Sequence, residues 1–500
     1  MAESVKHFLK VIPAQTMRPG DTYMTNDPWL GSGHLNDFVL VQPCFHKRKL
    51  VGLVSSTSHL IDLGGLGMGP DGSDVYDEGL IIPPMRLVDR GVINETLMTL
   101  VKANSRTPFQ NEGDIYALIA CCDVAHARLD QMMTEFNISS LAPIGNYIHK
   151  VSQRASVAAI DAAPQGSWQN RMMIDGYDFE IELVARLTID KGQIEVDFDG
   201  SSGCSRFGIN VPLNYATAYS VFGLRCIFAP EVPNNAGSLA PFKVVAPLGC
   251  IVNAARPMPV AQRHIIGQLL PDVVLGCLRQ AMPKHIPAEG ASCMYDLPMR
   301  GGFDATSNAQ ATRFAVELTH NGGTGARPGK DGLSATAFPS GVYGSQVEVT
   351  ESTAPLLIHR RELRPDSGGA GRYRGGLGQI IEVESHEGQA FDFFGTVDRV
   401  KYPARGCFGG KDGAPGQLAL RSGKRMQGKG KQPIPAGESL IFQTPGGGGY
   451  GDPRKRAPAQ VARDFVAGLI SRKALRQVYG VCLKPDGTVD SPATRELRRT

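Results

Sequence analysis

Two short apolar runs near the N-terminus predict a β-hairpin. They are Phe38-Val39-Leu40-Val41 and Leu50-Val51-Gly52-Leu53-Val54. Both favour strands, and the basic segment His46-Lys47-Arg48-Lys49 between them suits an exposed turn. Antiparallel pairing about this turn places Asn36 or Asp37 opposite His59, the choice depending on a register shift of one residue. Polar residues that are distant in sequence are therefore expected to meet at the open end of the hairpin.

Helical and strand patterns continue along the chain. Apolar residues recur at a helical period between Gly113 and Phe136, and again over about 216–228 and 265–282. Alternation over 179–187 and 194–198, with Lys191-Gly192 between them, predicts a second hairpin. The last fifty residues are predicted to be helical, with Ser471 capping a short second helix and Gly480 ending it.

Glycine-rich segments dominate residues 301–449, interleaved with short predicted strands. Because glycine lets a backbone approach a ligand or another chain closely, these loops suit a substrate pocket or a subunit interface. Tight turns in an all-β region are the alternative. Asp366 and Ser367, in the string RPDSGG, are the candidate polar residues of these loops.

These patterns predict an α+β fold, a large mixed and β-rich body with glycine-rich loops and a C-terminal helical segment. A polar stretch at 164–176 suggests a boundary. We expect an N-terminal part at 1–165 that carries the hairpin, an α/β middle part at 166–300, a glycine-rich β part at 301–450, and helices at 451–500, all within one unit.

Composition narrows the function classes. The chain has 500 residues, 42% hydrophobic and 20% charged, as an ordinary globular protein does. Its net charge of +4 is dispersed and gives no reason to expect a nucleic acid or membrane partner. No apolar run is long enough for a membrane span, no apolar signal region is evident, and the ten cysteines are scattered. We therefore expect a cytoplasmic location.

Candidate chemistry centres on the open end of the first hairpin. His34, Asp37 and His59 are expected to gather there, and Asp62 and Asp27 lie in the flanking loops. Two imidazoles and a carboxylate are typical ligands of zinc, manganese or iron, and they leave coordination positions open for water or substrate. The alternative is structural, with both histidines capping strand ends and Asp37 accepting hydrogen bonds from backbone N–H groups.

Two arginines are further candidates for substrate or interface loops. Arg106 lies in a polar turn before the predicted 113–136 helix, where it can bind an anion or simply pair with a carboxylate. Arg263 precedes the predicted 265–282 helix and is followed by His264, which is weak evidence by itself.

Several short motifs occur in order along nearly the whole chain. They are PGD at 19–21, TNDP at 25–28, GHLND at 33–37, HLIDLGG at 59–65, EGLIIPP at 78–84, DFDGSS at 197–202, PV at 259–260, RPDSGG at 364–369, RGGLG at 374–378 and TPGGGG at 444–449. Together they resemble the hydantoinase B family. In 5-oxoprolinases, N-methylhydantoinases and acetone- or acetophenone-type carboxylases, this component partners an ATP-using hydantoinase A-type component.

The resemblance implies that His34, Asp37 and His59 match the metal ligands of the carboxylase relatives. Two positions depart from the family pattern. Leu60 follows His59 where relatives often have a second histidine, and Ala240 precedes Pro241-Phe242 where many have arginine before Pro-Ile. With Leu60, the expected ligand His59 is kept and only its neighbour changes. The change at Ala240 affects possible substrate contacts.

The function expected from the resemblance is the hydrolysis of a cyclic amide. The separate hydantoinase A-type partner would use ATP, since this chain has no P-loop, and this chain would deliver water with a divalent metal (Mn, Zn or Fe), Asp62 acting as support or general base. A component of a ketone carboxylase is the alternative within enzymes. The sequence begins at what resembles the family's interior, so a shortened, non-catalytic scaffold is also an alternative.

Overall fold

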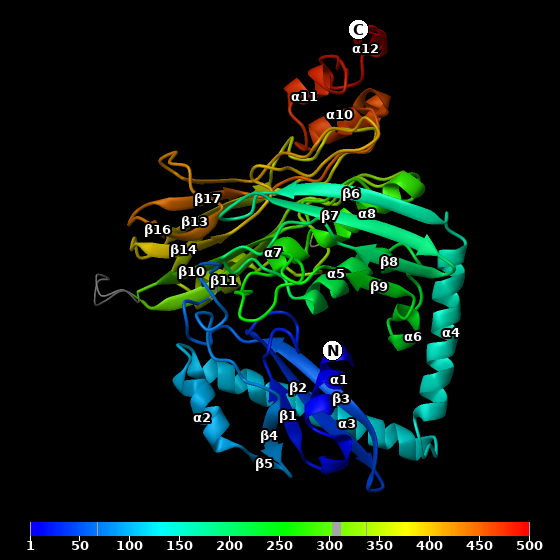
Figure 1. Ribbon diagram of the computed structural model, residues 1–500. Helices are drawn as coiled ribbons and strands as arrows, with labels where there is room; N and C mark the ends of the chain where they lie inside the picture. Colours follow the sequence, from blue (N-terminus) through cyan, green and yellow to red (C-terminus); the bar gives the residue numbers. More distant parts are fainter. Residues whose placement is uncertain (1, 68, 303–311, 337, 500) are drawn as a thin grey trace.

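The computed structural model describes residues 2–67, 69–302, 312–336 and 338–499 and confirms a mixed α+β fold. The strands form four sheets, and helices contact three of them. In Figure 1 the N-terminal sheet lies below the rest of the molecule, and the C-terminal helices project at the opposite end.

The N-terminal sheet has five strands in the order β3-β2-β1-β4-β5. A helix, α1 (Ala2–Val11), packs on it through Phe8, which is fully buried. The strands are β1 (Thr22–Thr25), β2 (Asp37–His46), β3 (Lys49–His59), β4 (Met85–Asp89) and β5 (Val92–Ile93).

The predicted hairpin is formed by β2 and β3, and its register is set by its turn together with a β-bulge. Lys47 and Arg48 both have positive φ, 47° and 67°, as a two-residue hairpin turn requires. Pairing from this turn alone would place Asn36 opposite His59, but the register shifts by one residue between Cys44 and Phe45, so Asp37 lies opposite His59.

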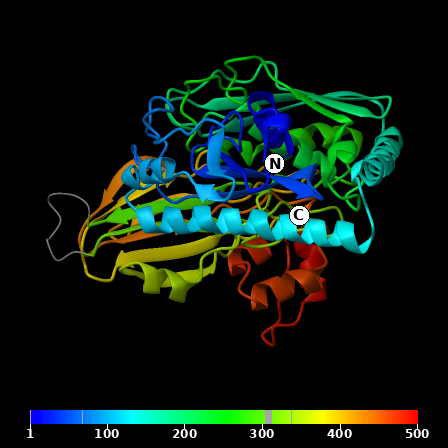
Figure 2. The same cartoon turned by 90° about the horizontal axis from the view of Figure 1, so that it is seen from below.

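Three helices follow the N-terminal sheet: α2 (Glu95–Ala103), α3 (Pro108–Glu135) and α4 (Ala142–Asp161). The predicted 113–136 helix is α3, which crosses beneath β2 and β3 in Figure 2. Polar contacts fix it there, since Gln42 Nε2 donates to Asp123 at 2.7 Å and His46 Nδ1 lies 2.6 Å from Asp130. The sequence patterns missed α4, because its buried face includes Ser152 and Ser156 rather than a full apolar stripe.

The middle sheet contains β6 (Gly166–Ile174), β7 (Ile181–Asp190), β8 (Gln193–Asp197) and β9 (Phe242–Val245). Helices α5 (Leu213–Arg225) and α8 (Leu270–Ala281) pack on it around one apolar core, and the short helices α6 (Ala236–Leu239) and α7 (His264–Gly267) join them. The polar stretch at 164–176 is a strand and not only a connection. Its outward residues are polar, but Met172 and Ile174 are buried.

Two four-stranded sheets form a β-sandwich with a shared core. One contains β10 (Met294–Gly301), β11 (Phe314–Asn321), β14 (Phe391–Thr396) and β16 (Lys429–Ile434). The other contains β12 (Leu356–Leu363), β13 (Gln379–Ser385), β15 (Gln417–Leu420) and β17 (Ser439–Gln443), and α9 (Val347–Thr353) contacts β12. Tyr295, Leu297 and Phe393 point into this core, so the alternate residues of β10 and β14 lie on the outer face.

Most of the glycine-rich segments pack against one another, and we call segments 322–325, 368–376 and 446–449 the glycine bundle. Backbone bonds run between the segments: Gly447 N donates to Gly376 O at 3.0 Å, and Gly376 N donates to Thr324 O at 2.8 Å. A Cβ atom on Gly447 would overlap the carbonyl oxygen of Thr324. Glycine is needed here because the backbones touch.

The chain ends in α10 (Pro458–Val466), α11 (Arg472–Gln477) and α12 (Ser491–Arg499). Ser471 caps α11 as predicted, its hydroxyl oxygen accepting a bond from Ala474 N at 3.1 Å, and Gly480 follows the helix with φ of 62°. No helix within the described ranges combines the length and the apolar character needed to cross a bilayer.

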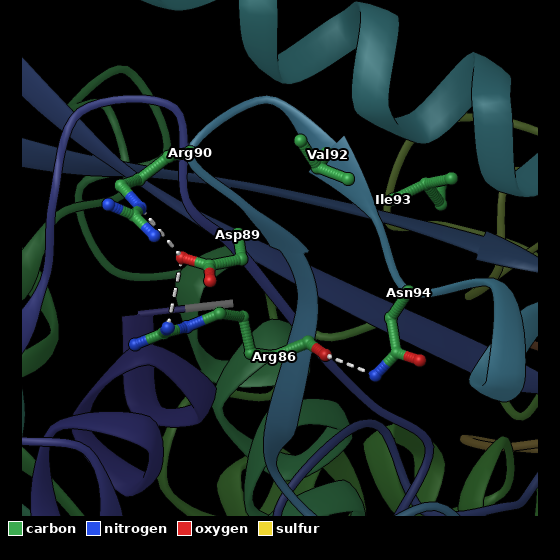
Figure 3. A pocket seen from close by; sticks show the side chains of 6 residues that line it. All are labelled: Arg86, Asp89, Arg90, Val92, Ile93 and Asn94. Atoms are coloured by element: carbon green, nitrogen blue, oxygen red, sulfur yellow. Dashed lines mark hydrogen bonds and ion pairs between the residues drawn. The ribbon is translucent and has the colours of Figure 1, made fainter.

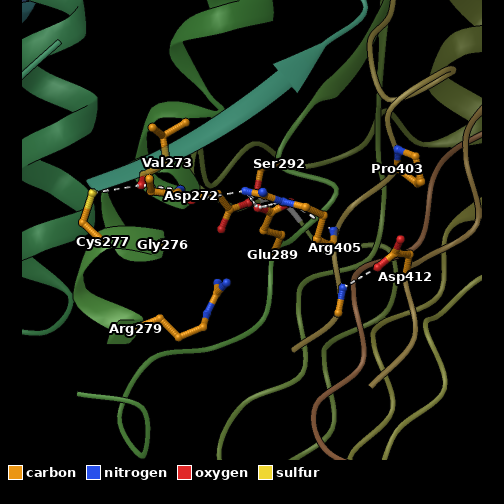
Figure 4. Close-up of polar contacts among 12 residues, drawn as sticks. Asp272, Val273, Gly276, Cys277, Arg279, Glu289, Ser292, Pro403, Arg405 and Asp412 are labelled. Carbon is orange, nitrogen blue, oxygen red and sulfur yellow. Dashed lines mark hydrogen bonds and ion pairs between the residues drawn. The ribbon is translucent and has the colours of Figure 1, made fainter. Parts of the chain in front are cut away.

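A buried ion cluster joins α8 to the loops beside the sandwich (Figure 4). Arg405 Nε donates to Glu289 at 2.7 Å, Ser292 Oγ donates to Asp272 at 2.6 Å, and Arg399 lies 3.4 Å from Glu289. Burial and the charge of Glu289 raise the pKa of Asp272 to about 6. Each buried carboxylate therefore has a positive or hydroxyl partner, as such burial requires.

Replacing Gly447 with alanine should destabilise the fold by about 2 kcal/mol, because the new methyl group would force the glycine bundle apart. Urea unfolding followed by circular dichroism measures the change. Gly113→Ala is the matched control, since Gly113 lies in α3 with no atom close to the added methyl group and should lose no stability. Equal midpoints for the wild type and Gly447→Ala would contradict the packing argument.

Candidate active site

The structure brings His34, Asp37 and His59 together at the open end of the hairpin. Asp37 begins β2 and faces His59 at the end of β3. His34 lies in the loop before β2, with its ring centroid 5.0 Å from that of His59. Its Nε2 is 3.1 Å from Asp37 Oδ2. The side chains that the sequence pattern grouped are therefore neighbours in space.

The segment before α7 closes over this cluster. Arg263 Nη2 donates to Asp37 Oδ2 at 2.7 Å, and Ser32 Oγ donates to the same oxygen at 2.6 Å. The Ala261 carbonyl oxygen lies 3.2 Å from His34 Nδ1. The guanidinium of Arg263 also stacks on Tyr215, 4.6 Å from the ring centroid. Arg263 thus joins the N-terminal hairpin to the middle part of the chain.

Burial sets the charges of the cluster. It lowers the pKa of His34, and it lowers the pKa of His59 to about 4. Burial also works against ionisation of Asp37, but the positive charges of His34 and Arg263 outweigh it and hold the pKa of Asp37 well below its usual range. At neutral pH the site therefore contains neutral imidazoles beside an ionised carboxylate.

His264 adds a third imidazole. It is buried at the start of α7, its Nε2 has no hydrogen-bond partner, and burial lowers its pKa to about 4. Within the described part of the chain, however, no group of three or more His, Cys, Asp or Glu side chains has an arrangement that could hold a metal ion as the side chains stand.

A small cleft adjoins the cluster, with a volume of about 60 Å³. The outer face of the β10–β11–β14 sheet forms one wall, through Pro298, Arg300, Glu317 and Phe394. The loop after β3 and the turn before α3 form the other wall, through Ile61, Asp62, Leu66, Gly67, Arg106 and Thr107. None of the three cluster residues lines this cleft, but Ile61 and Asp62 follow His59 in the loop after β3, and the charges of Asp37 and Arg263 act on Glu317.

The other predicted site residues have structural contacts. Asp62 Oδ1 accepts from Arg106 Nη1 at 2.6 Å, and its other oxygen accepts from the Arg106 backbone N–H. Asp27 pairs with Arg256 and accepts a bond from Trp29 N. Arg106 and Asp62 line the cleft, whereas Asp27 does not.

Asp366 and Ser367 belong to the scaffold of the glycine bundle. Asp366 accepts a bond from Ser471 N at 2.8 Å, which ties the bundle to the C-terminal helices. Ser367 Oγ donates to Arg364 O at 2.6 Å and accepts from Gly378 N at 2.9 Å. Neither residue lines the cleft beside the histidine cluster.

A second pocket, with a volume of about 720 Å³, lies at the β5 edge of the N-terminal sheet (Figure 3). It is lined by Arg86, Asp89, Arg90, Val92, Ile93 and Asn94. Asp89 pairs with both arginines, at 3.1 Å and 3.4 Å. None of its lining residues belongs to the His34 cluster.

Sequence reasoning assigned no role to Asp296 and Glu317. Asp296 lies on β10 and Glu317 on β11, and the charge of Asp296 partly offsets the lowering of the pKa of His59 and His264 by burial. The only local signal was an acidic residue in each of two apolar strings, YDLPM and AVELT. Their proximity depends on the pairing of strands on either side of residues 302–313.

Glu78 holds in place the backbone segment that contacts His34. Its Oε1 accepts bonds from Val260 N at 2.5 Å and Ala261 N at 2.7 Å, which fixes the segment that contacts His34. Burial raises the pKa of Glu78 to about 8, although these two N–H groups oppose the shift. The side chain is therefore mostly protonated at neutral pH.

The chain is similar to known proteins over most of its length. The family model described as Hydantoinase B/oxoprolinase matches residues 1–453. The B-type component of a putative D-/L-hydantoinase of Pseudomonas sp. (strain NS671) is 28% identical over 97% of this chain and 84% of its own length. The crystal structure of ATP-dependent caprolactamase from Pseudomonas jessenii matches 100% of this chain and 89% of that chain, with a TM-score of 0.89 and 27% identity.

A nucleotide-free structure of acetone carboxylase has the same fold. It matches 100% of this chain and 74% of that chain, with a TM-score of 0.84. The sequences are 20% identical, so this likeness concerns the fold alone.

Glu78 should make stability fall as pH rises. The folded chain holds a proton on Glu78 up to about pH 8, whereas the unfolded chain releases it near its ordinary pKa of 4.5. The folded state therefore binds more protons in this window, and its stability decreases as pH increases through it. In Glu78→Gln this decrease should be smaller, because the amide keeps the acceptor oxygen and never ionises. Urea unfolding at about pH 5 and about pH 9 checks this. The same pH dependence in both proteins would contradict it.

Proposed function

The chain belongs to the hydantoinase B/oxoprolinase family, and we propose that it is the B-type component of an ATP-dependent cyclic amide hydrolase. In this proposal a separate hydantoinase A-type partner binds ATP and phosphorylates the amide oxygen. The Pseudomonas hydantoinase relative is named as one component of a larger enzyme, which supports a partner chain, and the ATP-dependent caprolactamase supports the reaction class.

The observation that carries the proposal is the cluster of buried polar side chains with a cleft close to it. An amide carbon is a poor electrophile because of resonance, and phosphorylation of its oxygen activates it. Such an intermediate must be kept from bulk water until the intended water attacks. At about 60 Å³ the cleft between the sandwich and the N-terminal part has room for a few water molecules, so in this proposal its walls move apart to admit the substrate.

The positive charges of the cleft suit a phosphorylated substrate. Arg106 and Arg300 lie on opposite walls. Arg106 is held in place by Asp62 and by the Gly65 carbonyl oxygen at 2.7 Å. Of the two roles that we expected for Asp62, support of the site or general base, its contacts therefore favour support. The ion pair of Asp27 with Arg256 likewise supports a structural role.

His34, Asp37 and His59 are the residues that would hold a divalent metal. Their chemistry suits one, because the imidazoles are neutral, Asp37 is ionised, and a backbone carbonyl lies beside His34 Nδ1 and leaves Nε2 facing the cluster. Since the side chains do not enclose an ion as they stand, binding requires them to converge and Asp37 to reorient. A bound metal would supply a water of lowered pKa.

Metal analysis of the complex purified with its A-type partner tests the ligand set. We expect near-stoichiometric Mn, Zn or Fe in the wild type and at least about a tenfold loss of metal in His59→Ala. His386→Ala is the control, because His386 is exposed on the sandwich. Equal metal content in the two variants, or none in the wild type, would remove these residues as ligands.

The reaction class is tested by assaying the complex with hydantoins, lactams and 5-oxoproline. We expect phosphate release that depends on both ATP and a cyclic amide, with one amide bond opened for each ATP used. Phosphate release that instead depends on a ketone and bicarbonate would identify a carboxylase. Release with neither substrate class, from a complex that assembles, would favour a scaffold role.

A further inference from the structure

Glu317 lines the cleft, and its carboxyl group shares a hydrogen bond with that of Asp296 on the same face of the sandwich. Asp296 of β10 lies opposite Thr319 of β11, and Pro298 lies opposite Glu317. Asp296 and Glu317 are therefore diagonal neighbours on the same face of the sheet. Glu317 is hydrogen-bonded to Asp296, and Thr319 Oγ1 donates to Asp296 Oδ1 at 3.0 Å.

Such a pair holds one proton. Two carboxylates cannot accept hydrogen bonds from each other, so one of them must carry the proton for the bond to form. Burial, and then the negative charge of Asp296, raise the pKa of Glu317 well above its usual range. Glu317 is thus protonated at neutral pH and donates to Asp296, which also accepts the Thr319 hydroxyl.

Charged groups from three directions surround the pair. Arg263 and Asp37 act on Glu317 from the N-terminal cluster, and they oppose each other. The charge of Asp296 also acts on His59 and His264. Asp62, Arg106 and Arg300 line the same cleft as Glu317. A proton on the pair therefore lies between the histidine cluster and the space where a substrate would bind.

We propose that Asp296 and Glu317 form a proton-transfer pair that protonates the ring nitrogen of the activated amide while it accepts a proton from the attacking water. This inference rests on the proposed function. It adds two residues that none of the sequence motifs contains, and it assigns them the acid and base roles.

The step balances in atoms and electrons. The oxygen of water bonds to the carbon of the phosphorylated amide, and the electron pair of the C=N bond moves to the ring nitrogen. The nitrogen takes the proton of Glu317, and the proton released by the water passes to Asp296. The pair then holds one proton, as it did before, and the shared hydrogen bond returns that proton to Glu317.

As the resulting tetrahedral intermediate collapses, the nitrogen again takes the proton of Glu317 and the new hydroxyl gives its proton to Asp296. The electron pair of the O–H bond forms the C=O bond, the C–N bond breaks, and its electron pair stays on the released amine. The acyl phosphate that remains is hydrolysed by a second water to a carboxylate and phosphate.

A purely structural pair would behave differently. If the two side chains only held β10 to β11, an amide in place of Glu317 would keep the hydrogen bond to Asp296 and the function with it. Because a Gln side chain cannot release a proton, Glu317→Gln separates hydrogen bonding from proton transfer.

The first experiment measures the protonation of Glu317 directly and does not require an enzymatic assay. The complex with the A-type partner is labelled with [¹³C]glutamate, and the carboxyl signals are followed by NMR as pH is raised. We expect two glutamates to stay protonated at neutral pH, one lost in Glu317→Gln and the other lost in Glu78→Gln. The absence of the first signal in the wild type would overturn the proposal, whether or not the substrate is known.

The second experiment measures amide opening by the same complex. Glu317→Gln and Asp296→Asn should each lower kcat at least about 100-fold, as loss of a general acid or base does. The high-pH limb of the wild-type profile should be absent from Glu317→Gln, and metal content should be unchanged in both. Glu362→Gln, at an exposed site on β12, is the matched control.

The outcomes separate this inference from the proposed function. A wild-type complex that opens no cyclic amide contradicts the proposed function, while the NMR signal still tests the shared proton. A wild-type complex that is active, with Glu317→Gln equally active and the same pH profile, overturns the proton-transfer pair and leaves the proposed function standing.

Discussion

The ion pair between Asp37 and Arg263 is the contact on which the site depends. It joins the first residue of β2 to the segment before α7, across 226 positions of sequence, with a distance of 2.7 Å. Both side chains are largely removed from water, so loss of either partner would leave a buried charge, at a cost of about 3–5 kcal/mol. Ser32, His34 and Tyr215 contact the same pair. The histidine cluster is thereby held against α7 and next to the outer face of the sandwich.

The glycine bundle holds the ends of the sandwich strands in place. Segment 322–325 directly follows β11, and segment 446–449 follows β17 after Thr444 and Pro445. Gly323 N donates to the Pro445 carbonyl oxygen at 3.0 Å and so joins the two chain regions. The position of β11, which carries Glu317, is therefore coupled to a densely bonded scaffold. We expected glycine to admit a ligand or a second chain. Within the described residues most of these glycines instead admit other segments of this chain, which explains why Asp366 and Ser367 have scaffold contacts.

The sequence allowed the site residues of the first hairpin to be predicted, but not those that the sandwich strands contribute. The turn at Lys47 and Arg48 limits the β2–β3 register to two choices, and a β-bulge between Cys44 and Phe45 selects the one that brings Asp37 to His59. Short-range patterning was sufficient to group these residues, as it was for α3 and for the cap of α11. It failed for α4, whose buried face has serines, and it assigned no strand to β6, whose outward face is polar. It could not place Asp296 and Glu317, because their contact with each other and their approach to His59 arise from long-range strand pairing and packing that no periodicity records.

The central claim is that the histidine cluster and the cleft beside Glu317 form one active site for a cyclic amide. A crystal structure of the complex with its A-type partner and a hydrolysis-resistant cyclic amide analogue tests it most directly. We expect the analogue between the sandwich and the loop after β3, with its ring nitrogen at hydrogen-bond distance from Glu317 and its carbonyl side toward the His34 cluster. An analogue bound elsewhere, for example at the Arg86 and Arg90 pocket of Figure 3, would contradict the account.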